Sequence, residues 1–405
     1  MKRIAFTSGW KSSVKLAGLC GLIAATFVFA MFQGGFVSWF LFASFLPFAI
    51  YSIALSFYSI HDFTVDRIVS KSEFRAGDNL EVELNIQRKI PFPLYYLLIE
   101  EQLPEKLEKN TSAKKKILVF PWFKRNVSLL YTISTLPRGE HILKSVRIKT
   151  GDFLGLFEKE TEFPIYNKLL VFPAYYELPY RQLDNLFDQG QAGKANRLQR
   201  ENSIVTGVRE YQQGDQFSWI NWKATAKKND FMTKEFEERK SHDLFLVLDE
   251  TASECFEDMI SYTASFVHSI IKKGIQTGFF SLGANGGQPL SVKGGEMQKQ
   301  RIFYSLALAE ETAGPPIEKI VETNKHMIPS SAALIIVTSS LSYFTIETLA
   351  SFKTSQQITV FSIKNKSALT REEIMLREAS LARGIGVKYI NKGQILSSLS
   401  GVIAQ

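Results

Sequence analysis

The sequence predicts a multidomain protein made of a two-helix transmembrane hairpin, a β-sandwich-like domain and an open, mostly parallel α/β sheet. Three observations predict this order. The first 61 residues hold two long apolar runs and no Asp or Glu, residues 62–180 alternate between apolar and polar side chains, and strands alternate with helices from residue 242 onward. A chain of 405 residues that is 45% hydrophobic and 22% charged has the composition of a folded protein.

The two apolar runs are expected to form spans at about residues 15–33 and 36–60, joined by a Gln-Gly-Gly turn. The second run has 25 residues without a charge. As a helix it extends over about 37 Å, which crosses about 30 Å of hydrocarbon with some tilt. A cleavable signal peptide is the alternative for the first run. However, a polar mature chain follows a signal peptide, whereas here another apolar segment follows within three residues.

Positive charges predict the orientation, because Lys and Arg stay on the cytosolic side of a membrane. Four precede the first span, none lies in the turn, and Arg67 and Lys71 follow the second span. We therefore expect a multi-pass protein of the cell membrane with both termini in the cytosol. The net charge of +8 owes half its size to the four N-terminal cations, so it indicates contact with anionic lipid rather than with nucleic acid.

Residues 62–180 are expected to form a β-rich, sandwich-like domain. In 80–86, four apolar residues alternate with polar ones, as in a strand with one buried face. Other strand candidates are 94–101, 117–123, 127–134, 142–150 and 168–173. Six short strands with no convincing helix among them indicate a β-sandwich, and a barrel is the alternative.

Residues 242–405 are expected to form the α/β domain, and 181–241 connect it to the β-domain. A buried strand at 244–249 leads to a helix near 254–273 with one apolar face. Further strands are expected at 276–282, 333–339, 357–363 and 387–391, with helices near 296–312, 316–327, 344–354, 370–383 and at the C-terminus. Near-continuous apolar strands separated by helices predict an open parallel sheet, and the Gly-rich segment 283–295 predicts a hairpin beside it.

The carboxyl end of the first strand is the expected ligand position in such a sheet. Asp249 stands there, with the hydroxyls of Thr251 and Ser253 following, and these are oxygen ligands that suit Mg²⁺. The spacing resembles the Asp-x-Ser-x-Ser start of the metal-ion-dependent adhesion site of von Willebrand factor A domains. That family also expects a Thr in a later loop and an Asp at a later strand end, but 293–299 has no Thr and the later strand ends in Thr338-Ser339-Ser340. Two interpretations follow, a degenerate metal site and a helix N-terminus capped by oxygen side chains.

No catalytic constellation stands out. The sequence has no Gly-x-Ser-x-Gly elbow, no phosphate-binding loop and no dinucleotide-binding fingerprint. The five histidines are scattered without metal-ligand spacing. We expect no catalytic residues and no cofactor other than Mg²⁺ at the Asp249 site.

Residues 207–240 carry a distinctive set of Gly, aromatic and charged residues. The set comprises Gly207, Arg209-Glu210-Tyr211, Gly214-Asp215, Ile220, Trp222-Lys223-Ala224, Ala226 and Glu235-Phe236-Glu237. It resembles the signature of the bacterial DUF58 family, and the likeness extends over about residues 135–255. Asn221 and Lys227 depart from it, since His and Arg are usual there. The resemblance implies a membrane hairpin, a β-rich domain and a von Willebrand factor A-like domain. It also implies association with MoxR-type AAA+ ATPases.

The same stretch has seven basic and six acidic residues, which is no phosphate-binding stripe. We expect it to pack between the two domains with Tyr211, Phe217, Trp219 and Trp222 buried at their ring bodies, and Arg209 paired with Glu210, Asp215 or Glu235. One edge is expected to dock a partner through Arg209, Trp222 and Lys223.

The favoured function is a membrane-anchored, non-enzymatic adaptor. Its cytosolic A-like domain would dock a protein, with a MoxR-type ATPase as the implied partner, in assembly or maintenance of envelope proteins. The alternative is a Mg²⁺-dependent hydrolase built on Asp249. An extracellular adhesion protein is a third interpretation, and it requires the opposite topology.

Overall fold

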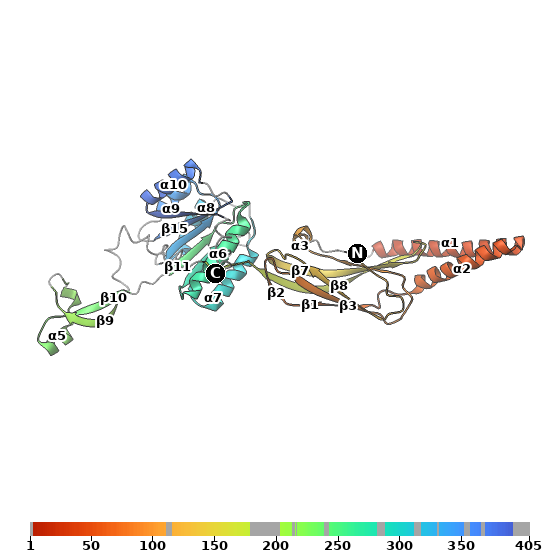
Figure 1. The fold of residues 1–405 in the computed structure, drawn as a ribbon, viewed down its shortest axis with the longest axis horizontal. Coiled ribbons are helices and arrows are strands. Elements are labelled where there is room, and N and C mark those ends of the chain that lie inside the picture. Colours follow the sequence, from red (N-terminus) through yellow and green to blue (C-terminus); the bar gives the residue numbers. More distant parts are fainter. Residues whose placement is uncertain are drawn as a thin grey trace, which may run out of the picture. The chain divides into compact units, whose positions relative to one another are not determined.

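The computed structural model describes residues 3–110, 116–178, 203–212, 215, 217–238, 243–281, 288–311, 317–329, 332–351, 357–365 and 369–391. The chain divides into two compact units, Met1–Phe172 and Pro173–Gln405, and each is described by itself (Figure 1). The boundaries expected at residues 61, 180 and 241 stay predictions. The C-terminal helix expected after residue 391 lies outside the described residues.

Two long helices open the first unit, α1 (Arg3–Gln33) and α2 (Phe36–Phe57). Gly34 takes a φ of +61° in the turn between them, a conformation that glycine adopts without steric cost. The segments Val14–Gln33 and Phe36–Phe57 are long and apolar enough to cross a membrane. The second helix ends at Phe57 rather than at residue 60, because Tyr58 and Ile60 turn into the core of the β-domain.

The β-domain consists of two sheets. One has the strand order β1-β3-β6 and the other β2-β8-β7-β4-β5. The bounds are β1 (Thr64–Val69), β2 (Glu73–Arg75), β3 (Leu80–Gln87), β4 (Leu97–Glu101), β5 (Lys116–Val119), β6 (Asn126–Ile133), β7 (Gly139–Gly151) and β8 (Glu158–Phe172). Leu84 and Ile86 of one sheet pack with Ile99 and Val146 of the other in a single core cluster. This is the packing of a sandwich.

Three features of the β-domain differ from expectation. Strands β1 and β2 were not expected, because the charged residue Arg67 occupies an inward position of β1 and hides the alternation, and β2 has only three residues. Strand β8 begins ten residues earlier than 168, since most of its length is only half-buried and pairs with β7. The expectation that no helix interrupts the strands is wrong, because α3 (Glu105–Asn110) follows β4.

The α/β domain has the sheet order β13-β12-β11-β14-β15-β16. All neighbours are parallel except β13, which pairs antiparallel with β12. The strands are β11 (Leu244–Leu248), β12 (Thr277–Ser281), β13 (Leu290–Lys293), β14 (Ala333–Thr338), β15 (Ile358–Lys364) and β16 (Ile385–Asn391). This is the open, mostly parallel sheet that the sequence predicts.

Helices cover both faces of this sheet (Figure 1). They are α6 (Phe256–Lys272), α7 (Glu296–Leu308), α8 (Ile317–Thr323), α9 (Tyr343–Ser351) and α10 (Arg371–Ala382), with a 3₁₀ turn at Lys325–Met327. Val247 of β11 packs with Ile317 of α8 and Ile346 of α9. On the other face, Phe361 of β15 contacts Tyr262 and Phe266 of α6.

Within the second compact unit, the described residues between 203 and 238 form a small β-hairpin. Strand β9 (Ser203–Glu210) pairs antiparallel with β10 (Met232–Glu238), and a 3₁₀ turn (Phe217–Trp219) and helix α5 (Trp222–Lys228) lie between them. Among those of its residues whose burial is described, Ile220 and Met232 are the buried apolar ones. We call this segment the β9–β10 hairpin.

Candidate functional site

Asp249 follows β11 directly, at the point where the strand order of the sheet reverses between β11 and β14. Its carboxylate is 1% exposed and both oxygens are occupied. Oδ1 accepts from the Thr251 backbone N–H at 3.0 Å and from Thr251 Oγ1 at 2.6 Å, and Oδ2 accepts from Thr338 Oγ1 at 2.6 Å. The carboxylate therefore ties the end of β11 to the end of β14.

The three predicted metal ligands do not converge. Thr251 lies against Asp249, but Ser253 Oγ faces Met259 Sδ at 4.0 Å. The neighbouring acid, Glu250, accepts a hydrogen bond from Ser281 on the opposite side of β11. Within the described residues, no group of three or more His, Cys, Asp or Glu side chains could hold a metal ion. The geometry is that of a structural carboxylate satisfied by hydroxyl and backbone donors.

A second buried carboxylate supports the adjoining helix. Glu318 of α8 accepts hydrogen bonds from Ser342 Oγ at 3.1 Å and from Thr345 Oγ1. Ser342 Oγ in turn accepts from the Thr345 backbone N–H at 3.0 Å, which caps the start of α9. Sequence reasoning missed Glu318, because it lies on a separate helix and nothing local marks it.

Arg209 is fixed by a carboxylate of its own unit. Its Nη2 donates to Asp215 Oδ1 at 2.8 Å, and its Nη1 donates to the Glu210 carbonyl at 3.1 Å. Asp215 also accepts from the Gln212 backbone N–H at 3.0 Å. The hydrogen bond from Arg209 lowers the pKa of Asp215 and raises that of Arg209. Asp215 is thus the partner among the three acids expected for Arg209.

Helix α5 presents Trp222 and Lys223 in its first turn, both exposed. The expected burial of aromatic rings is wrong at two positions, since Phe217 is 75% and Trp222 64% exposed. Ile220 and Met232 are buried instead. Arg209 and Ile220 pair with Thr233 from opposite sides of β10. Trp222 follows Ile220 by two residues, so Arg209 and Trp222 lie in the same hairpin but on opposite sides of β10.

Asn221 has a structural role that accounts for one departure from the family pattern. Its side chain accepts from the Ala224 backbone N–H at 3.3 Å and caps α5. Its own N–H donates to Met232 O at 2.8 Å. Asn is among the best capping residues, so no imidazole is needed for this helix to begin.

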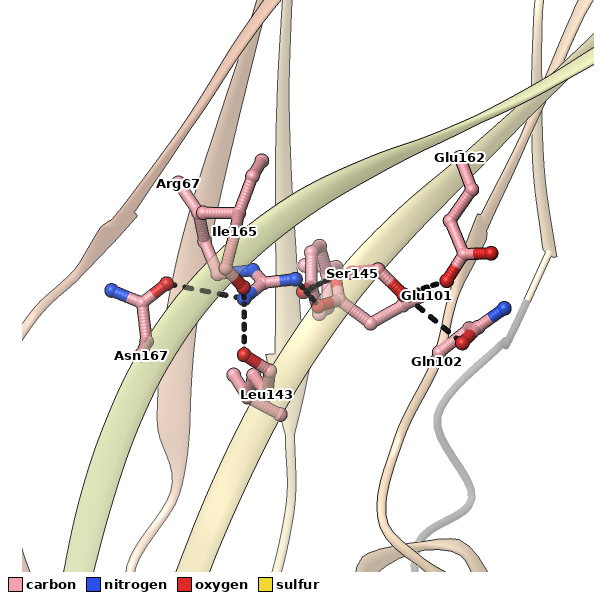
Figure 2. A network of polar contacts seen from close by, with 9 residues as sticks. Arg67, Glu101, Gln102, Leu143, Ser145, Glu162, Ile165 and Asn167 are labelled. Atoms are coloured by element: carbon pink, nitrogen blue, oxygen red, sulfur yellow. Dashed lines mark hydrogen bonds and ion pairs between the residues drawn. The ribbon is translucent and has the colours of Figure 1, made fainter. Parts of the chain in front are cut away.

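A polar network inside the β-domain was also missed. Arg67 of β1 forms an ion pair with Glu101 of β4 (Figure 2). Tyr131 of β6 donates a hydrogen bond to the same carboxylate. Arg67 Nη1 also donates to Ile165 O at 3.0 Å and Asn167 Oδ1 at 3.1 Å. The side chains of Arg67 and Glu101 are 0% and 7% exposed. Arg67, expected as a charge flanking the second span, is therefore buried between the two sheets.

Known protein sequences show which family the chain belongs to. A sequence model described as "Protein of unknown function DUF58" matches residues 207–368. The uncharacterized protein YeaD of Bacillus subtilis (strain 168) is 38% identical over 392 residues, 96% of this chain and 96% of its own length. The chain belongs to the DUF58 family. Every candidate site residue, from Arg209 to Ser253, lies in the DUF58 match.

Solved structures resemble this DUF58 chain only distantly. A conjugative transposon lipoprotein from Bacteroides eggerthii is 16% identical, with a TM-score of 0.18 over 26% of this chain and 97% of its own. The sporulation control protein Spo0M of Bacillus subtilis is 12% identical, with a TM-score of 0.16 over 37% of this chain and 58% of its own. TM-scores this low do not indicate a shared fold.

Proposed function

We propose that this DUF58 protein is a membrane-anchored, non-enzymatic adaptor. Helices α1 and α2 anchor it in the cell membrane with both termini in the cytosol, and the α/β domain is von Willebrand factor A-like. The β9–β10 hairpin docks a protein partner through Arg209, Trp222 and Lys223. The length and apolar surface of the two helices support the anchor.

The exposed ring of Trp222 is the observation that carries the docking proposal. An indole that is 64% exposed beside the cation of Lys223 is the kind of group that dominates binding energy at interfaces. Phe217 and Phe231 of the same unit are 75% and 57% exposed. Arg209 is held in place by Asp215, so its guanidinium is ordered before a partner arrives.

The family resemblance makes a MoxR-type AAA+ ATPase the partner to test first. The process that we propose is the assembly or maintenance of envelope proteins. Enzymatic turnover is not part of the proposal, because the Asp249 carboxylate at the sheet switch point accepts hydrogen bonds from two threonines, as a structural carboxylate does. A Mg²⁺-dependent hydrolase at Asp249 remains the second candidate.

The test is a binding titration of the full chain in nanodiscs with the MoxR-type ATPase of the same bacterium. Trp222→Ala should raise the Kd by about 30-fold or more, the loss typical of a central interface tryptophan. Phe344→Ala is the matched control, because this ring on α9 is 62% exposed and lies outside the hairpin. Equal affinities for Trp222→Ala and the wild type would refute the docking surface.

A further inference from the structure

A groove lies between α2 and the loop that joins β3 to β4. Its volume is about 520 Å³. The lining from α2 includes Leu46, Pro47, Ile50 and Tyr51, and the facing wall consists of Phe92 and Pro93. Both walls belong to the first unit, so the anchor helix and the β-domain form this groove together.

The depth of the groove follows from the helix geometry. Helix α2 has 22 residues, so it extends over about 33 Å, close to the thickness of the hydrocarbon core. Pro47 lies ten residues before the end of α2 at Phe57, a rise of about 15 Å. In the proposed membrane the groove therefore runs from the middle of the bilayer to its cytosolic surface, and its open side faces acyl chains.

Aromatic side chains surround the groove from Phe48 to the end of α2. Ring centroids of Phe48 and Phe153 are 6.0 Å apart, and those of Tyr58 and Phe92 are 4.8 Å apart. The ring centroids of Tyr95 and Phe153 are 4.1 Å apart, and those of Tyr51 and Phe153 are 5.4 Å apart. Trp122 lies edge-on to Tyr95 at 6.3 Å and is 54% exposed. Its φ of +49° is rare for a bulky residue. Tyr and Trp side chains are typical of the boundary between hydrocarbon and headgroups.

Cations lie beside the end of the groove at Tyr58, whose hydroxyl donates to Ile90 O at 3.1 Å. The buried guanidinium of Arg88 joins two loops, since Nη1 donates to Phe92 O at 3.0 Å and Nε donates to Lys124 O at 2.9 Å. These bonds hold the turn that carries Lys124 and Arg125 against the loop that forms the groove wall. Lys89, Lys124 and Arg125 are exposed. A headgroup above the groove therefore meets positive charge.

We propose that this groove binds a bilayer phospholipid with an anionic headgroup. One acyl chain lies along α2 against Phe92 and Pro93, and Lys89, Lys124 and Arg125 attract the phosphate. The proposal rests on the membrane anchoring proposed above, but it does not depend on the protein partner. Continuity with the span surface supports an acyl chain, and charge complementarity supports an anionic lipid.

The experiment uses the full chain in nanodiscs of phosphatidylcholine with a small fraction of phosphatidylglycerol that carries a photoreactive diazirine on one acyl chain. Mass spectrometry then maps the adducts. They are expected on the peptides that contain residues 43–54 and 92–93. Unlabelled phosphatidylglycerol should compete with the probe, and phosphatidylcholine should compete less.

Two variants separate the site for the acyl chain from the site for the headgroup. Ala54→Phe fills the groove that Ala54 helps to line, and Ala25→Phe on exposed α1 surface is its control. The first should abolish the mapped adducts and the second should keep them. Lys89→Gln with Lys124→Gln should lower the preference for phosphatidylglycerol by about fivefold per lysine. Lys71→Gln with Lys144→Gln, also exposed, removes equal charge away from the groove and should leave the preference unchanged.

Three results would overturn the inference. Adducts spread evenly around the hairpin would mean bulk lipid, and a cross-link to another protein chain would mean a protein occupant. Unchanged adducts in both Ala54→Phe and the lysine pair would show that neither feature binds lipid. Release of the protein from membranes by alkaline carbonate would instead refute the anchor itself. If the protein stays in the membrane but no adducts map to the groove, only the lipid-binding proposal is refuted, and the membrane anchor stands.

Discussion

The residue with the largest structural consequence is Arg67. Burial raises the pKa of Glu101, and the positive charge of Arg67 opposes this shift without cancelling it. Burial also raises the pKa of Tyr131, so its hydroxyl stays protonated and donates to Glu101. The ion pair therefore spans the two sheets at a high desolvation cost, and each member depends on the other.

Removing only one partner should expose that dependence. Arg67→Met leaves the Glu101 carboxylate buried without its cation, and we expect a loss of about 3–5 kcal/mol in the free energy of unfolding. Arg67→Met with Glu101→Leu and Tyr131→Phe removes the whole polar group and should recover most of that loss. Urea unfolding of the full chain in detergent measures both. Equal destabilisation by the single and triple variants would contradict a charge-based cause.

At the scale of residues, the sequence indicates local chemistry better than distant partners. The spacing Asp249-x-Thr251 correctly brings two oxygen side chains together, because both lie on one turn. Thr338 is 89 positions away, and only the parallel pairing of β11 with β14 brings it to Asp249. Likewise, nothing local distinguishes a buried Arg67 from a cation that flanks a membrane span.

Among the elements, strand β12 is tightly confined at Gly278. Gly278 of β12 pairs with Phe245 of β11, and a Cβ built there would lie 2.6 Å from the ring atom Cδ2 of Phe245 and 3.0 Å from Leu290 O. Neither the ring, which is buried, nor the backbone carbonyl can move freely. Glycine is thus required here for close approach rather than for an unusual φ.

The substitution Gly278→Ala should therefore destabilise the α/β domain by about 1–3 kcal/mol through overpacking. Gly294→Ala is the matched control, because its Cβ would meet only Gln276 Cγ at 3.6 Å, an ordinary contact. Thermal unfolding of the full chain in detergent should show a lower midpoint for the first variant and an unchanged one for the second. A similar midpoint for both would mean that β12 can shift.

Element types were predictable wherever one periodicity extends over a whole element. Helix α10, for example, begins beside Thr370 with a capping box to Glu373, close to the expected bounds of 370–383. Ends set by tertiary packing were not predictable, as at α2, whose apolar run continues past Phe57 into the core of another domain. The β9–β10 hairpin was missed because its rings are mostly exposed and give no period.

For the whole molecule, the proposed topology leads to a prediction about the turn and the β-domain. In a chain with Cys20→Ala and Cys255→Ala, Gly35→Cys between the helices should react with a membrane-impermeant maleimide on intact cells. Lys71→Cys in the β-domain should react only after lysis, because we expect it in the cytosol. The reverse pattern would support the extracellular interpretation and contradict the adaptor proposal.

The C-terminal end of α2 packs into the core of the β-sandwich. Leu55 packs in the same cluster as Val65 and Ile148, and Ser52 Oγ donates to the buried Asp152 carboxylate at 2.6 Å. Because these contacts leave no hinge between α2 and the β-sandwich, a tilt of the helical hairpin in the membrane would rotate the sandwich by the same angle. Thinner bilayers tilt long spans more. Membrane thickness would then steer where the sandwich points.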